Sequence, residues 1–123
     1  MKIFEKDGKV NFVDENNVLV GFAYEGRCCE FFGYYFTDSR PKVYEEDSAD
    51  QVKEPNLEGF YFSQDSPDFF DGDGNDAEGS AVFKLSDGDG KFLYLVLYNS
   101  HNGYYSHGFH MDVGGFRVFD GDL

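Results

Sequence analysis

Closely spaced turn residues are the feature of this chain that most constrains its fold. They separate short apolar segments at Asp7-Gly8, at "DENN" (14–17), at "DGDG" (87–90) and at "DVGG" (112–115). Asp-Gly and similar pairs favour the tight turns of β-hairpins, because these residues tolerate positive φ angles. The spacing therefore predicts short antiparallel strands joined by hairpins, and leaves little room for long helices.

The apolar segments between the turns have the two-residue period of β-strands. In "VLVGFAY" (18–24), Val18, Val20 and Phe22 share one face. In "FLYLVLY" (92–98), three leucines share one face, and aromatic residues and a valine share the other. Apolar residues on both faces predict central strands. The aromatic segment 28–36 is expected to form a further strand.

These patterns predict a mainly β fold with antiparallel strands, either a sandwich or a rolled open sheet. The last four expected strands (80–86, 91–98, 104–111 and 116–120) read as a C-terminal four-stranded meander. One short helix is expected over Ser48–Lys53, with Ser48 as its N-cap, and this would make the fold α+β. The chain has 15 Phe, 9 Tyr and no Trp, so the core is expected to be rich in Phe and Tyr rings.

The length of 123 residues fits one domain, with residues 37–79 as an acidic, loop-rich insertion. Cys28 and Cys29 are adjacent, too close for an unstrained disulfide, so two reduced thiols are expected. The segment 1–12 lacks the apolar stretch of a signal peptide. The longest apolar run is far shorter than the roughly 18 residues of a membrane span. A cytoplasmic protein is expected.

The negative charge is concentrated in one part of the chain. The net charge is −14, and residues 45–80 alone hold twelve acidic residues and one lysine. Direct binding to nucleic acid or to an anionic membrane is not expected, because phosphate groups require cationic partners. A basic protein partner, cations or simple solubility all fit this distribution. Adaptation to high salt is a further explanation of the acidity.

The sequence predicts a partner-binding site in the acidic segment. An aromatic pair, Phe69-Phe70, lies inside a run of carboxylates, and an apolar centre surrounded by charge suits a basic protein surface. The alternative is that both rings pack into the core. The candidate partner-binding residues are Asp68, Phe69, Phe70, Asp71, Asp73, Asp76, Glu78 and Tyr104.

The same loop raises the possibility of calcium binding. It begins with the D-x-D-x-N pattern of an EF-hand loop, but Asp76 stands where the pattern requires glycine and Val82 where it requires glutamate. The EF-hand interpretation therefore fails. An irregular calcium site, formed by Asp71, Asp73, Asp76 and Glu78, stays open.

The histidines and cysteines could form a zinc site or a nucleophile–base pair. His107 and His110 are three residues apart, a spacing that brings ligands together on a helix but not on a strand. One of them could still meet Cys28 or Cys29. The simpler expectation is a partly buried, hydrogen-bonded His107 with His101 and His110 exposed.

Two short motifs resemble a known family. "CCE" (Cys28–Glu30) opens an aromatic strand, and "NGYYS" (Asn102–Ser106) follows an apolar strand. This pair resembles a family of small uncharacterised proteins of bacteria and their phages. The resemblance implies a compact domain in a mobile-element or phage setting, and it implies no reaction.

Together, these features predict a small acidic, non-enzymatic binding protein without a cofactor. An immunity protein, an inhibitor or an anti-defence protein that recognises a basic partner would each fit. A protein that mimics DNA would need an ordered acidic surface, which the glycine-rich loop does not favour. The alternative class is a calcium- or zinc-binding protein that uses the acidic loop or the Cys and His residues.

Overall fold

The structure is a computed structural model, and it describes residues 1–24, 32–39, 51–71, 78–100 and 107–123. These residues form β-strands, turns and bends, and none of them is helical. No helix among them could cross a membrane. The strands are β1 (Lys2–Lys6), β2 (Lys9–Val13), β3 (Val18–Ala23), β4 (Phe32–Thr37), β5 (Gln51–Val52), β6 (Tyr61–Phe62), β7 (Phe69–Asp71), β8 (Glu78–Ser86), β9 (Phe92–Ser100), β10 (Gly108–Val113) and β11 (Phe116–Asp122).

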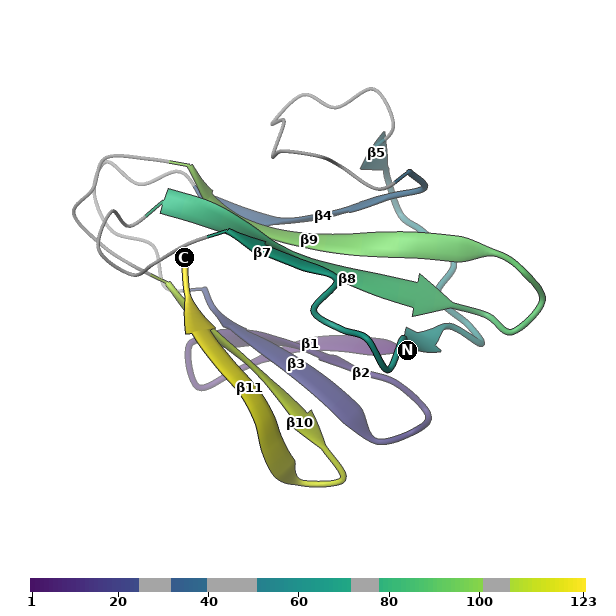
Figure 1. The fold of residues 1–123 in the computed structure, drawn as a ribbon, viewed down its shortest axis with the longest axis horizontal. Coiled ribbons are helices and arrows are strands. Elements are labelled where there is room, and N and C mark those ends of the chain that lie inside the picture. The colour runs from purple at the N-terminus through teal and green to yellow at the C-terminus, as the bar shows by residue number, and fades with distance from the viewer. Residues whose placement is uncertain (25–31, 40–50, 72–77, 101–106) are drawn as a thin grey trace.

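The strands form two antiparallel sheets in two layers (Figure 1). The five-stranded sheet has the order β1-β2-β3-β10-β11. The six-stranded sheet has the order β5-β4-β9-β8-β6, and β7 also pairs with β8. One apolar core contains side chains from both sheets. The mainly β, antiparallel fold predicted from the sequence is therefore confirmed, in the form of a sandwich.

The predicted C-terminal meander is wrong, because its four strands are divided between the two sheets. β8 and β9 form a hairpin in the six-stranded sheet, whereas β10 and β11 form a hairpin in the five-stranded sheet. β9 has β4 as its second neighbour, and β10 has β3. This division lets the inner faces of β9 and β10 cover each other, which a single flat sheet would not achieve.

The short helix expected over Ser48–Lys53 does not form in the part that the structure describes. Gln51 and Val52 form β5, which pairs with Phe36 and Thr37 of β4. Residues 48–50 lie outside the described residues. Pairing with an open sheet edge satisfies backbone groups of β5, and a helix this short would gain little from its own hydrogen bonds.

The predicted hairpin turns are confirmed. Asp7 and Gly8 have φ angles of 56° and 76°, and Gly114 and Gly115 have φ angles of 60° and 89°. Two successive positive φ angles characterise the turn that matches the twist of a two-residue hairpin. These turns fix the registers of β1 with β2 and of β10 with β11.

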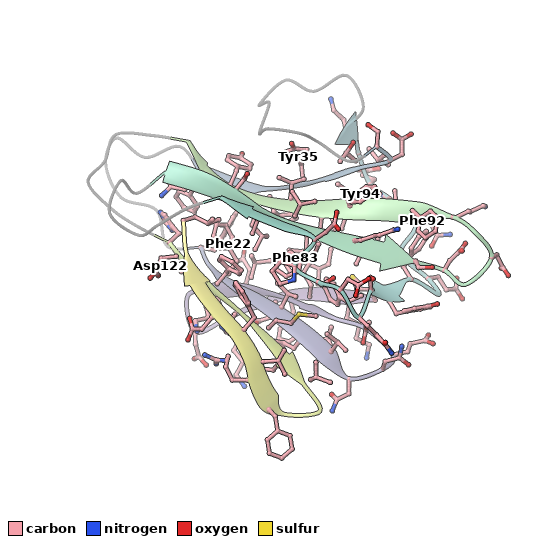
Figure 2. All side chains as sticks on the ribbon, viewed as in Figure 1. Phe22, Tyr35, Phe83, Phe92, Tyr94 and Asp122 are labelled. Carbon is pink, nitrogen blue, oxygen red and sulfur yellow. The ribbon has the colours of Figure 1, made fainter. Side chains whose placement is uncertain are left out.

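Phenylalanine rings dominate the core between the sheets. Phe12, Phe22, Phe83 and Phe109 are fully buried. Phe83 of one sheet meets Phe109 of the other edge to face, with ring centroids 5.9 Å apart and planes at 85°. Figure 2 shows Phe22 and Phe83 pointing into the space between the layers, and Tyr35 lying on the far face of the six-stranded sheet. Edge-to-face pairs add to the free energy of burial.

The acidic middle of the chain also contributes to the core. Leu57, Phe60 and Phe62 are buried and belong to the main apolar cluster. Residues 37–79 were expected to be loop-rich, and between β4 and β8 their described part contains only the short strands β5, β6 and β7. The segment is thus attached to the sandwich by buried apolar side chains as well as by strand pairing.

A buried carboxylate links the two sheets. Asp14, in the turn between β2 and β3, accepts hydrogen bonds from the backbone amides of Asn16 and Val18, both at 2.9 Å. Its other oxygen accepts a bond of 2.8 Å from the amide of Phe62 in β6. Bonds from amides to a charged acceptor are stronger than those between neutral groups. Asp14 therefore holds β6 against the five-stranded sheet.

We expect Asp14→Ala to lower the free energy of unfolding by about 3 kcal/mol, because it leaves buried amides without an acceptor. Asp87→Ala is a matched control: Asp87 also accepts bonds from two amides, those of Asp89 and Lys91, but in an exposed turn. We expect this control to cost less than about 1 kcal/mol. Urea unfolding of both variants measures the difference, and equal losses would contradict the role given to Asp14.

Candidate functional site

The structure places the predicted aromatic pair in a paired strand. Phe69 and Phe70 form β7 with Asp71, and the strand lies along Ala81 and Val82 of β8. The segment 64–79 was interpreted as a loop, which is wrong for residues 69–71 and 78–79. The edge of β8 offers unpaired backbone groups, and pairing there outweighs the local turn preferences. The side chains of residues 69–71 lie outside what the structure describes.

The other predicted partner-binding residues are only partly described. Asp68 precedes β7, and its amide donates a 2.7 Å hydrogen bond to the carbonyl of Val82. Glu78 begins β8, but its side chain is not described. Asp73, Asp76 and Tyr104 lie outside the described residues. The structure therefore brings Asp68 and the β7 residues together along β8.

His107 is hydrogen-bonded, as expected from the sequence, but it is fully buried, whereas partial burial was expected. Its Nδ1 lies 3.0 Å from the carbonyl oxygen of Ala23, so Nδ1 carries the proton, because a carbonyl oxygen only accepts. The ring stacks on Phe32, with centroids 4.0 Å apart, and also contacts Phe22 of the core. His107 therefore packs as part of the sandwich interior.

His110 was expected to be exposed, and this expectation is wrong. Its ring lies over Gly21 of the neighbouring strand, where a β-carbon would come within 2.5 Å of the ring atom Cε1. Only 8% of the residue is exposed, because the missing side chain of Gly21 leaves room for the ring. Gly21 and Phe22 point to opposite faces of β3, so His110 and His107 lie on opposite sides of the sheet, as the alternation predicted.

Charged side chains surround His110 on the outer face of the five-stranded sheet. Arg117 donates to Asp112 at 2.6 Å and to Asp120 at 3.3 Å, and His110 Nε2 lies 3.9 Å from Asp112. Burial, followed by the charges of Arg117 and Lys9, lowers the pKa of His110, and Asp112 and Asp120 oppose this shift. His110 is therefore neutral at pH 7, and the cluster resembles a structural ion-pair network.

The described residues contain no group of three or more His, Cys, Asp or Glu side chains placed to hold a metal ion. The residues of the two metal hypotheses are mostly outside this part of the chain: Cys28, Cys29, Asp73 and Asp76 are not described. Both metal hypotheses stay predictions.

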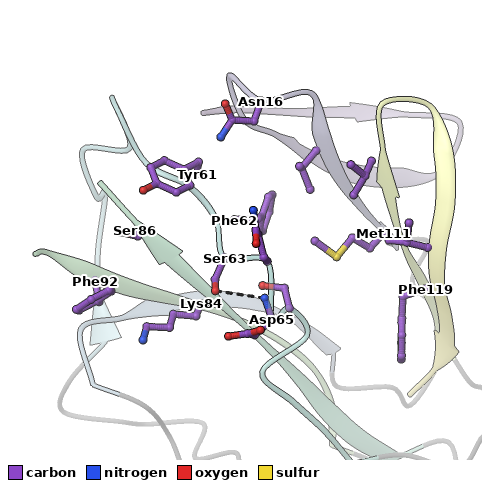
Figure 3. A pocket seen from close by; sticks show the side chains of 15 residues that line it. Asn16, Tyr61, Phe62, Ser63, Asp65, Lys84, Ser86, Phe92, Met111 and Phe119 are labelled. Carbon is purple, nitrogen blue, oxygen red and sulfur yellow. Dashed lines mark hydrogen bonds between the residues drawn. The ribbon is translucent and has the colours of Figure 1, made fainter. Parts of the chain in front are cut away.

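A cleft of about 880 Å³ lies on the described surface. It runs over the segment Tyr61–Ser66, with side chains of the five-stranded sheet on one side and of β8 and β9 on the other (Figure 3). The β10–β11 hairpin diverges from the six-stranded sheet in this region (Figure 1). The inner face of the hairpin is therefore not fully covered.

The walls of the cleft combine apolar and polar groups. Val113 and Val118 are 41% and 58% exposed, and Met111 and Phe119 lie deeper in the wall. The opposite side carries the exposed Phe92, whose ring is covered in part by the Lys84 ammonium at 4.2 Å. The polar lining consists of Asn16, Tyr61, Ser63, Gln64, Asp65, Ser66, Lys84 and Ser86.

One residue of the cleft lining has a buried polar atom. The hydroxyl oxygen of Ser66 is buried, and it has no hydrogen-bond partner among the described residues. A buried hydroxyl without a partner costs about 1–3 kcal/mol. The lining thus combines apolar residues with a larger number of polar ones.

No sequence pattern described above predicted this cleft. The available signal was "VGGFRVF" (113–119), in which apolar residues flank a hairpin turn that normally lies in solvent. Val113, Phe116 and Val118 are exposed in the structure. Apolar side chains exposed together beside a hollow mark interaction surfaces more often than single exposed ones do.

No family model, curated protein or solved structure matches the chain. The motifs that carry the family resemblance, at 28–30 and 102–106, lie outside the described residues. The resemblance therefore stays a prediction.

We expect the stability of the protein to fall more steeply on acidification than that of a His110→Gln variant. The pKa of His110 is lowered in the folded state, so the unfolded chain takes up this proton first as the pH falls below about 6.5. The loss grows until the pH passes the folded pKa. Urea unfolding at two pH values measures the loss of stability in each chain. Carboxylates and the other histidines contribute to the loss in both chains, so the comparison isolates His110. Equal losses in the two chains would refute the shift.

Proposed function

We propose that this chain is a non-enzymatic binding protein that recognises a basic protein partner through the cleft beside Tyr61–Ser66. The observation that carries the proposal is a set of exposed apolar walls in a chain of net charge −14. An immunity protein, an inhibitor or an anti-defence protein is the kind of binding protein that these properties fit. The proposal applies to the molecule in the cytoplasm.

The apolar walls supply affinity in this proposal. Covering Val113, Val118 and Phe92 with apolar side chains of a partner removes exposed surface from water. Fully burying one side chain of this size contributes about 1.5–3 kcal/mol. Hot spots of protein interfaces are commonly such apolar anchors in a pocket, surrounded by polar groups.

In this proposal the carboxylates attract the partner and favour a basic one over others. Residues 45–80 carry a net charge of −11, and this stretch includes the cleft segment and Asp65 in the cleft lining. Asp68, Asp71, Asp73, Asp76 and Glu78 are assigned to steering the basic partner. Such fields raise association rates more than they raise affinity, and salt weakens them. The apolar anchor is assigned to the cleft instead of Phe69 and Phe70, because Val113, Val118 and Phe92 have exposed side chains there.

Selection of peptides from a displayed random library tests the proposed function. We expect the selected peptides to be enriched in both Lys or Arg and apolar residues. Their binding should weaken about tenfold in a Val113→Ser, Val118→Ser double variant, because apolar contact is lost. Ile3→Ser is the control, since Ile3 is similarly exposed on β1. No enrichment of basic residues, or equal binding by both variants, would overturn the proposal.

We expect no change in the thermal unfolding midpoint when calcium, zinc or EDTA is added. An ion that binds only the folded chain must raise the midpoint by mass action. Differential scanning fluorimetry with each ion measures this. A midpoint that rises with calcium and falls again with EDTA would support the alternative function, a calcium site in the acidic loop.

A further inference from the structure

β11 is an edge strand that borders the cleft. In the described part of the chain, β11 pairs with β10 and with no other strand. All seven residues of β11 are exposed or half-buried. Val118 and Phe119 belong to the cleft lining, so the free edge and the cleft are continuous. Figure 1 shows β11 at the margin of the five-stranded sheet.

The backbone of β11 presents hydrogen-bonding groups at this edge. His107 and Leu123 exchange two hydrogen bonds of 2.9 Å, so they form a hydrogen-bonded pair of the antiparallel ladder. Such pairs alternate with pairs that do not bond to each other. The pairs Asp122 with Gly108 and Asp120 with His110 are therefore non-hydrogen-bonded pairs. The N–H and C=O groups of Asp120 and Asp122 therefore point away from β10, toward the free edge of β11.

The two sides of this edge differ in chemistry. Phe119 faces the interior, where it stacks on Phe109 with centroids 5.5 Å apart, and lines the cleft. Asp120 and Asp122 lie on the other side and are exposed, and Figure 2 shows Asp122 at the end of β11, directed away from the core. An added strand would meet an apolar wall on one face and carboxylates on the other.

The other edges of the sandwich suit a basic segment less well. β1 is the opposite edge of the same sheet, and it carries Lys2 and Lys6, which repel cations. Lysines on an edge strand commonly prevent unwanted pairing. β5 and β6 have only two residues each, and β7 has three. β11 is thus the long edge with acidic side chains, and its one cation, Arg117, is bonded to Asp112 and Asp120.

We propose that an extended segment of the basic partner adds to the five-stranded sheet as a strand beside β11. This inference rests on the proposed function and specifies the partner segment: apolar residues alternate with Lys or Arg. The basic residues stand opposite Asp120 and Asp122, and the apolar residues pack on Phe119 and enter the cleft. Addition of a strand to a sheet edge is a known mode of peptide recognition. The bulge at Val118 limits regular pairing to Phe119–Asp122.

The first test compares two synthetic peptides of roughly eight residues, a usual strand length. One alternates valine and lysine, and the other has the same composition with the lysines in one block. We expect the alternating peptide to bind at least ten times more tightly, measured by fluorescence anisotropy at low salt. Equal affinities of the two peptides would overturn the alternating pattern. If both peptides still bound more tightly than an acidic peptide, the proposed function would stand.

The second test uses backbone methylation of the alternating peptide and leaves the protein unchanged. Residues opposite Asp120 and Asp122 must direct their N–H groups to β11, so methylation of the lysine amides should weaken binding at least tenfold. Methylation of the valine amides should have a much smaller effect. Equal effects of the two methylation patterns would refute strand addition, and binding that still depends on Val113 and Val118 would leave the cleft proposal standing.

A protein variant provides the third test. Asp120→Pro removes an amide that faces the free edge, and Asp120→Ala removes the same carboxylate but keeps the amide. We expect the proline variant to bind the alternating peptide at least ten times more weakly than the alanine variant. Hydrogen exchange should also slow at the amides of residues 120 and 122 when the peptide binds. Equal binding by the two variants, with no change in exchange, would overturn the inference.

Discussion

The hydrogen bond from the Phe62 amide to Asp14 is the directional contact on which the position of the cleft segment depends. Apolar packing holds the two sheets together but does not fix how they approach at the end where they diverge. Asp14 fixes this by joining the turn between β2 and β3 to β6. The segment Tyr61–Ser66 begins at this bond and runs along the cleft. A shift of β6 would therefore move the segment Tyr61–Ser66, over which the cleft runs.

The divergence of the sheets explains why apolar residues remain exposed in such an acidic chain. The inner face of β10 and β11 is covered by the six-stranded sheet near Phe109, but not near Val113 and Val118. An uncovered apolar surface usually promotes self-association, and a high net charge opposes it by repulsion. The negative charge thus opposes self-association through the exposed apolar residues, and it is the same charge that the proposed function uses to attract a basic partner.

Much of the local structure could be predicted from the sequence, but the arrangement of the strands could not. The hairpin at Gly114-Gly115 depends on positive φ angles, which a local pattern reveals. The burial of His110 depends on the absence of a side chain at Gly21, nearly ninety residues away in the sequence. No local rule connects these two positions. For the same reason, local patterns predicted neither the cleft nor the strand pairing of Phe69 and Phe70 with β8.

By itself, the sequence determined the strand periodicity, the turns, the aromatic core and the strong negative charge, because these follow from neighbouring residues and from composition. Only the tertiary structure decided which strands became neighbours. β9 and β10 could have paired in one meander, but they joined different sheets so that their apolar inner faces could cover each other. As a result, β11 lies at the edge of the five-stranded sheet, and the other sheet does not cover the end of its hairpin. The cleft and the edge exist because burial is optimised over the whole chain, whereas sequence patterns report only local preferences.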